Sequence, residues 1–572
     1  MKTIKLVLCA LFIVLASSAG VERRSWGIDG AHRGYRGSSV WIQPTSHFFH
    51  TYPATFNSST DEITAVGNNL SVGSVVRFFP AAGAALPMVL NPELPYTVCS
   101  KNGDNIRVAL ALLGSCSSLV DFGDTGAGTI YLGTKVRSAT HVDHVYLDNP
   151  VLPEGVTIGR CLAGGTADCF AKHGTYWSYG GEQALWIRLD ISPDAALGPS
   201  LLSFTFHCRT GACMDEVLST TFTIEELKPL PVKQPISFPP VESKSAWEAQ
   251  MAARAAQWCP DKKNGTINWA PLNAFSFGAI GENQVWYYDA AWAFHQIADY
   301  TGDAQWRKCA ETISKEYADA LVNANGSFSA FHRYFPDGLL KYCESCQRRG
   351  ELAASLVWAH NALGGISNVA IRETAYALEA GIALAKTKNF RSFRRIRDPA
   401  LRDRIQQKAD LLWGTLVVYK DNPNAYFQSF MAGLGMRAAI EWYEFSGDER
   451  MPLVVKDLVD LMGSEMYGND PMHPNEVSWM RGLRAPGSGD QGPACGYNCS
   501  PYPAAELHAL FVPAWAFVWS RTGIDSYRVQ GDAMWSTIWT HDLSYSGKIF
   551  SQTFRWSFDY VAWREGRQPV RP

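Results

Sequence analysis

The sequence of 572 residues lacks an excess of charge of either sign. Lysine plus arginine number 51 and aspartate plus glutamate 54, which gives a formal charge of −3. This balance argues against a nucleic-acid-binding protein and against a strongly basic membrane-surface protein. The sequence also lacks a phosphate-binding glycine loop, a His-Glu-x-x-His motif and a Gly-x-Ser-x-Gly motif. We therefore expect no cofactor and no catalytic metal. The length and composition indicate a folded chain of several domains.

Long hydrophobic runs are almost absent. The one candidate, residues 6–16, follows Lys2 and Lys5 and precedes the small residues Ser17, Ser18 and Ala19. This order is typical of a secretory signal, and the run is too short to cross a bilayer. We predict that residues 1–19 are a signal peptide and that the mature protein is secreted or periplasmic, without a membrane span.

Cysteine usage fits an exported protein. One of the 13 cysteines, Cys9, lies in the signal, and the other twelve form an even set. Local spacing in such a set predicts disulfides, although the sequence leaves the connectivity open. The neighbouring pairs are Cys99/Cys116, Cys161/Cys169, Cys208/Cys213, Cys343/Cys346 and Cys495/Cys499, with Cys259/Cys309 as a possible sixth. Four zinc thiolates at Cys343, Cys346, Cys495 and Cys499 are the alternative, disfavoured by loose spacing and by an oxidising compartment.

The first part of the chain predicts β-sandwich modules. Residues 20–228 are rich in Gly, Ser, Thr and Val, and short runs such as 184–189 and 201–206 alternate with period two. We expect a β-rich module at 20–140 and a second module at 141–228. The second module resembles an immunoglobulin-like domain. An Asp-Ala-Ala-Leu-Gly turn precedes its penultimate strand, and a short turn at Cys208–Cys213 precedes its last strand. This architecture is common and implies little about function.

A proline-rich linker at 229–244 separates these modules from a helical domain at 245–572. Five prolines in residues 229–240 predict a stiff, extended connector. Beyond it the hydrophobic period becomes 3.6, and Gly302, Gly447 and Gly523 are placed as C-caps of aromatic-rich helices. The expected helices are 245–258, 284–300, 304–323, 350–363, 369–387, 400–419, 425–445, 449–466, 503–521, 525–540 and 549–564.

The helices differ in pattern within each hairpin. One helix is almost wholly apolar and aromatic, as in residues 285–294, and its neighbour is amphipathic, as in residues 306–317. A helix that is apolar on all sides is buried, so inner and outer rings of helices follow. Here the sequence resembles the (α/α)-toroid, or six-hairpin, superfamily of glycoside hydrolases and polysaccharide lyases, including the β-sandwich-first order of some of its cellulases. The Asp-Ala-Gly-Asp motif of those cellulases is absent, so none of their catalytic residues is carried over.

The resemblance implies a polysaccharide or oligosaccharide substrate in a central cleft. The N-terminal turns of inner helices would meet at one rim, where helix N-termini favour anions. The carboxylates expected there as catalytic residues are Asp289, Glu373, Glu506 and Asp490, with Asp289 and Glu506 as the first pair. Residues expected to bind substrate are Trp286, Tyr288, His332, Arg333, Arg372, Tyr376, His473, Trp479 and His508.

Three functions remain open from the sequence. Glycoside hydrolysis requires two carboxyl groups across the sugar bond and is preferred. Elimination by a polysaccharide lyase requires a Tyr or His base and an Arg, His or Asn that neutralises a uronate carboxylate. The third possibility is a non-catalytic extracellular protein that binds glycans or mediates adhesion. N-capping by Glu373 and Glu506, and a buried hydrogen bond of Asp289, are the structural alternatives. Long connections at 326–350 and 468–503 are expected to cover the rim.

Overall fold

The computed structural model describes two units of the chain. One comprises Met1–Glu226 with Arg484–Ser500, and the other Leu227–Leu483 with Pro501–Pro572. Within residues 20–571, the segments outside the description are 82–83, 91–95, 111–115, 117–118, 136–144, 163–176, 180–181, 185, 209–215, 234, 236, 260–287, 324–336, 346–370, 388–392, 422–426, 469–473, 478–479, 482–504, 542 and 544–546. The predicted signal peptide and the predicted helix 350–363 lie outside the described residues.

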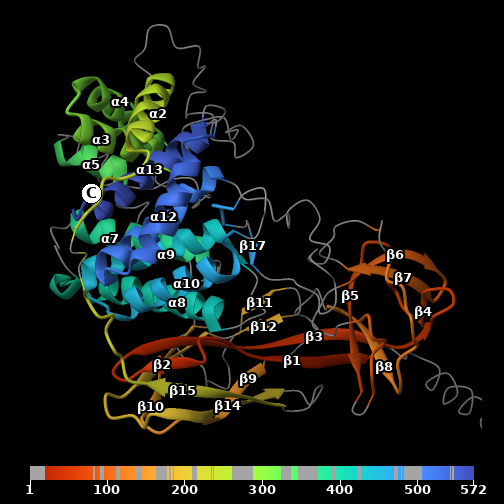
Figure 1. Cartoon of the computed structure of the whole chain (residues 1–572). Helices are drawn as coiled ribbons and strands as arrows, with labels where there is room; N and C mark the ends of the chain where they lie inside the picture. The colour runs from red at the N-terminus through yellow and green to blue at the C-terminus, as the bar shows by residue number, and fades with distance from the viewer. Residues whose placement is uncertain are drawn as a thin grey trace, which may run out of the picture. The chain divides into compact units, whose positions relative to one another are not determined.

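The first unit consists of β-strands (Figure 1). They are β1 (Gly20–Gly30), β2 (Arg33–Tyr35), β3 (Ser39–Asn57), β4 (Glu62–Ala65), β5 (Val75–Pro80), β6 (Tyr96–Asn102), β7 (Asn105–Leu110), β8 (Ile130–Lys135), β9 (Val145–Val151), β10 (Val156–Leu162), β11 (Trp177–Tyr179), β12 (Glu182–Ala184), β13 (Trp186–Ile191), β14 (Gly198–Cys208) and β15 (Glu216–Glu225).

Strand β3 takes part in two arrangements. Its C-terminal half pairs with β4 and β8, and the order β3-β4-β7-β6-β5-β8 closes on itself around a core that includes Phe56, Phe78 and Tyr96. Its N-terminal half pairs with β1, β12 and β13. A separate four-stranded sheet has the order β2-β15-β14-β9. Strands before residue 140 and after residue 141 therefore hydrogen-bond within one sheet, which the alternating pattern alone did not indicate.

The second unit is helical. Its helices are α2 (Lys244–Trp258), α3 (Ala290–Thr301), α4 (Ala304–Asn323), α5 (Asp337–Ser345), α7 (Ile371–Thr387), η3 (Phe393–Arg395), α8 (Pro399–Asp421), α9 (Ser429–Ser446), α10 (Arg450–Glu465), η5 (Ala505–Leu510), α11 (Val512–Thr522), α12 (Asp525–Ile538) and α13 (Gly547–Arg564). Two short strands, β16 (Phe427–Gln428) and β17 (Met480–Arg481), pair with each other, and β16 directly precedes α9.

The helix contacts form a closed circuit. Helix α3 packs against α5, α5 against α7, α7 against α9, α9 against α11, α11 against α13, and α13 against α3. Helices α2, α4, α8, α10 and α12 pack on members of this circuit. Burial follows the same division, because residues 290–298 of α3 are all buried while α4 alternates between buried and exposed positions.

Helix ends in this unit follow local sequence. Gly302, Gly447 and Gly523 adopt φ values of 71°, 76° and 64° and donate their N–H groups to the preceding turn. These left-handed C-caps confirm the glycine prediction, since a residue with a Cβ is disfavoured there. The proline-rich segment packs on this unit, with Phe238 edge-on to Trp519 at 5.5 Å.

Three expectations need correction. The stretch 326–350 is not entirely a loop, because α5 occupies Asp337–Ser345. The helix expected at 503–521 is divided into η5 and α11, with Pro513 near the start of the second. The helix expected from residue 284 has its N-cap at Asp289 and begins at Ala290.

Two predicted disulfides are confirmed, Cys99–Cys116 and Cys259–Cys309. Each of the other four pairs, and hence the zinc alternative, includes a cysteine outside the described residues. Among the described residues, none of the helices is long and apolar enough to span a bilayer.

Candidate functional site

A strained turn precedes α3. Tyr288 and Asp289 are consecutive non-glycine residues with φ values of 57° and 58°. This left-handed region is unfavourable for a residue with a bulky side chain, and such strain persists only where surrounding contacts enforce it. Asp289 supplies those contacts: its Oδ1 accepts the Trp292 N–H at 3.0 Å, and its Oδ2 accepts the Gly338 N–H at 2.9 Å. Asp289 therefore caps α3 and ties it to the start of α5.

The close approach of α5 to α3 requires glycine at position 338. A Cβ added to Gly338 would lie 2.3 Å from the Trp292 nitrogen and 2.5 Å from the Ala291 Cβ. Neither neighbour is the end of a flexible side chain, so both elements would have to separate. The small residue thus lets the backbone reach the Asp289 carboxylate.

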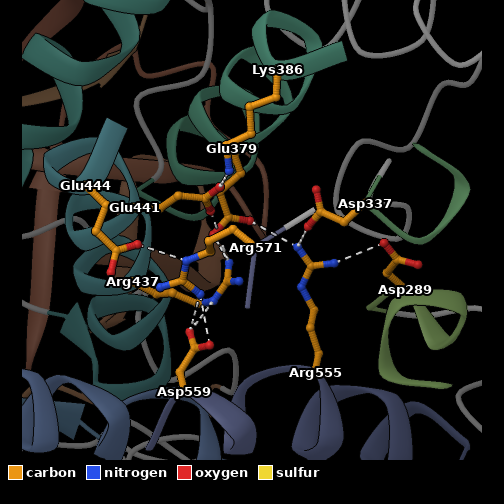
Figure 2. Close-up of polar contacts among 10 residues, drawn as sticks. All are labelled: Asp289, Asp337, Glu379, Lys386, Arg437, Glu441, Glu444, Arg555, Asp559 and Arg571. Atoms are coloured by element: carbon orange, nitrogen blue, oxygen red, sulfur yellow. Dashed lines mark hydrogen bonds and ion pairs between the residues drawn. The ribbon is translucent and has the colours of Figure 1, made fainter. Parts of the chain in front are cut away.

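Arg555 of α13 gathers three carboxylates from three other elements (Figure 2). Its Nη1 lies 3.2 Å from Asp289 Oδ2, and its Nη2 lies 2.6 Å from Asp337 Oδ2 and 3.4 Å from Glu379 Oε2. The Arg555 side chain is 0% exposed, and each carboxylate is at most 4% exposed. A buried guanidinium with several carboxylate partners holds α3, α5 and α7 to α13.

The charge cluster continues through Arg437 of α9. Its Nη1 contacts Glu379 Oε1 at 2.5 Å, and its Nε lies 3.5 Å from Asp559 Oδ2 (Figure 2). Asp559 also pairs with Arg571 at 2.7 Å, and Glu441 pairs with Lys386 at 3.3 Å. These ion pairs, with that of Glu444 and Arg571, connect six carboxylates and four cations, so the cluster has an excess of acid.

This excess is reflected in the pKa values. Burial raises the pKa of Asp289 to about 6 and that of Glu379 to about 7, although Arg555 opposes both shifts. Burial also disfavours ionised Glu441, but Lys386 and Arg437 outweigh it and lower the pKa of Glu441 to about 2. Asp289 and Glu379 therefore bind a proton at a higher pH than exposed carboxylates do.

A second group of side chains surrounds the strained turn. Tyr288 and Tyr376 belong to one buried cluster with Leu434, Leu507, Leu510 and Trp556, on which Phe430 packs. Apart from Trp556, these residues come from the N-terminal ends of α7 and α9, from the turn before α3 and from η5 before α11. The N-terminal ends of four segments therefore meet, and we call this region the rim. Glu506, next to Leu507, has its backbone at the same end, while its side chain is outside the description.

Arg372 and Glu373 are the partly exposed members of the rim. The Arg372 Nε donates to Glu373 Oε1 at 2.8 Å, and their side chains are 28% and 16% exposed. Arg372 also interacts electrostatically with Tyr376 and Tyr288. Burial, followed by the neighbouring Tyr288, raises the pKa of Tyr376 well above its usual value. Tyr376 is therefore protonated at neutral pH, and it lies beside Arg372, a partly exposed cation that pairs with Glu373.

His508, which the sequence predicts as a substrate-binding residue, is a buried side chain. It is 0% exposed, its Nδ1 lies 3.2 Å from Thr537 Oγ1, and its ring packs on Phe511 at 5.2 Å. Burial lowers its pKa to about 3, so the ring is neutral at physiological pH. It packs between η5 and α12, an arrangement that stabilises the fold.

Of the sites predicted from sequence, the structure describes the side chains of Asp289, Tyr288, Arg372, Glu373, Tyr376 and His508. Trp286, His332, Arg333, His473, Trp479 and Asp490 lie outside the described residues. Sequence reasoning missed Asp337, Glu379, Arg437 and Arg555. Charged residues set among the aromatic residues of a helix, as Arg555 and Asp559 are in α13, were the available signal. Among the described residues, none form a cluster of three or more potential metal ligands.

Comparisons with known proteins do not identify a family for this chain. The sequence matches no protein-family model and no curated protein. Among solved structures, one similar chain is "Polysaccharide Lyase BACCELL_00875", at 9% sequence identity and a TM-score of 0.25. The match covers 86% of this chain and 77% of that one. A likeness of this size carries no argument about fold or activity.

Proposed function

We propose that the helical unit is an (α/α) toroid and that the protein is an exported enzyme that cleaves an acidic polysaccharide by β-elimination at the rim. The closed helix circuit supports the toroid, and the β2-β15-β14-β9 sheet beside β10-β13-β3 supports an immunoglobulin-like module. The two disulfides support an oxidising compartment.

The strained Tyr288–Asp289 turn carries the proposal. Strain at consecutive residues is maintained here by Asp289, Gly338 and Arg555, and its result is to place Tyr288 beside Tyr376 and Arg372. Enforced strain is concentrated at sites where a side chain must be held in one position. A tyrosine pair beside a partly exposed arginine is the set of groups that elimination from a uronate requires.

The roles follow from the environment of each group. Arg372 binds the uronate carboxylate and stabilises the charge that develops on it when the neighbouring C5 proton leaves. Tyr288, acting as its phenolate, accepts that proton, the C5–H electron pair forms the C4–C5 double bond, and the C4–O bond breaks. Tyr376, whose pKa is raised, gives its proton to the departing oxygen.

Hydrolysis is the less favoured reaction because of Asp289. Both of its oxygens accept hydrogen bonds from backbone N–H groups, and one also contacts Arg555. A carboxylate occupied in this way supports the fold and does not reach a sugar bond. The expected pair of Asp289 with Glu506 therefore loses its first member as a proton donor to substrate.

Digestion of a polysaccharide panel with the purified chain tests the proposal. Absorbance of unsaturated uronates and the number of new reducing ends are followed together. We expect both signals to rise with a polyuronate, and Tyr376→Phe and Arg372→Gln to lower the rate by about 100-fold or more. Tyr300→Phe is the matched control, because Tyr300 lies at the other end of α3 and bonds Glu248.

The outcomes separate the three functions. Reducing ends without unsaturated product indicate hydrolysis and overturn elimination. Binding of glycans without cleavage of any panel member indicates the non-catalytic alternative. Equal loss of rate in Tyr300→Phe and Tyr376→Phe would show that the rim tyrosine has no specific role.

A further inference from the structure

A cavity of about 390 Å³ lies at the C-terminal ends of α9, α11 and α13. We call it the C-terminal pocket; its lining includes Tyr443, Glu444, Phe517, Arg521, Trp563 and Gln568. Its volume lies in the range of pockets that hold small organic ligands. Tyr443 follows Phe430 of the rim cluster by thirteen residues along α9, which corresponds to about 20 Å of helix. The pocket is therefore a different place from the rim.

Aromatic rings form one side of the C-terminal pocket. Phe517 lies between the other two rings, 6.3 Å from Tyr443 and 5.3 Å from Trp563, in edge-to-face arrangements. Each ring is contributed by a different helix of the circuit, so packing fixes their positions. Rigid aromatic surfaces with a polar edge suit a flat ligand that carries hydroxyl groups.

Arg521 gives the pocket its charge. Its guanidinium stacks on Tyr443 at 4.9 Å, and its Nε is buried without a hydrogen-bond partner among the described residues. Glu444 is already paired with Arg571 at 2.9 Å, so its charge is compensated. A planar guanidinium that lines a cavity is suited to a carboxylate.

We propose that the C-terminal pocket binds an acidic sugar residue. Arg521 contacts the sugar carboxylate, the aromatic rings contact the pyranose face, and Ser520 and Gln568 are placed to bond its hydroxyl groups. This site holds sugar without cleaving it and would anchor one end of a glycan away from the rim. It does not depend on the reaction proposed for the rim.

Calorimetric titration of the full chain tests the proposal, with glucuronate and galacturonate as probes. Glucose and galactose are the neutral counterparts. The titrations use Arg372→Gln as background, which removes the rim cation. We expect the uronates to bind at least about tenfold more tightly than the neutral sugars, because a charge-assisted hydrogen bond is lost with the carboxylate.

Arg521→Gln should lower uronate affinity by about tenfold or more, and Arg394→Gln, at an exposed position of η3, should leave it unchanged. Gln568→Ala, on the exposed C-terminal segment, gives a second reading if Arg521→Gln impairs folding, with several-fold weaker binding expected. Equal affinity for neutral sugars, no binding of either uronate at millimolar concentration, or unchanged affinity in both variants would overturn the proposal. Uronate binding that is present in the wild type and absent in the Arg372→Gln background assigns the sugar to the rim and leaves the elimination proposal standing.

Discussion

Glu379→Gln offers a direct measurement of the buried acid excess. Glu379 is 2% exposed and lies between Arg437 at 2.5 Å and Arg555 at 3.4 Å. Burial raises its pKa from 4.5 to about 7. The folded protein therefore takes up a proton between these values, and the stability that this protonation gives is complete below pH 4.5 and is lost as the pH rises through 7. A shift of this size corresponds to about 3 kcal/mol.

Glutamine mimics the protonated acid at every pH. Relative to the wild type, Glu379→Gln should gain about 3 kcal/mol between pH 4.5 and pH 8. For a helical unit of this size the change is about 5 °C in Tm, measured by scanning calorimetry at half-unit pH steps. The comparison of two proteins at each pH cancels the opposing titrations of His508 and His295, whose pKa values burial lowers to about 3 and about 4.

Glu311→Gln, on the exposed face of α4, is the control and should keep a constant Tm difference from the wild type. A Tm difference for Glu379→Gln that is equally constant across the pH range would refute the reasoning. It would mean that Glu379 does not titrate near neutral pH and that its two arginine partners fully offset its burial.

Two further predictions concern the same unit. Arg555→Met should lower the free energy of unfolding by about 3–5 kcal/mol at pH 7, because three buried carboxylates lose their shared cation. Arg555→Lys should lower the free energy of unfolding by less. An unchanged calorimetric Tm for Arg555→Met would contradict a structural role. Replacing Cys259 and Cys309 by serine removes a cross-link over 50 residues between α2 and α4 and should cost about 4 kcal/mol, seen as a lower urea midpoint that reductant does not lower further. A midpoint equal to that of the oxidised wild type would mean that this bond adds no stability.

Local features of the helical unit were predictable from sequence. The helices at 304–323, 449–466 and 525–540 agree with α4, α10 and α12 within two residues at each end. Their periodicity and the glycine C-caps act within one or two turns, so a short window of sequence contains the whole signal. The Cys99–Cys116 pairing was also predicted, from two cysteines only 17 residues apart.

The β modules were less predictable. Alternation identified strands, but β3 is 19 residues long and pairs with one set of strands through each half. A period of two shows which side chains share a face and gives no information about the partner strand. The closed order of six strands could therefore be read only from the pairings.

The sequence by itself determined the boundaries of α4, α10 and α12, the candidate rim residues Tyr288, Arg372 and Tyr376, and the presence of a carboxylate amid aromatic residues at Asp289. Only the tertiary structure decided that this carboxylate caps α3 and pairs with Arg555, 266 residues away. It also decided that Glu379, 176 residues from Arg555, joins the same cluster. Closure of the helix circuit brings these charges together, and burial then sets their protonation, so neither has a signal within any one segment of the chain.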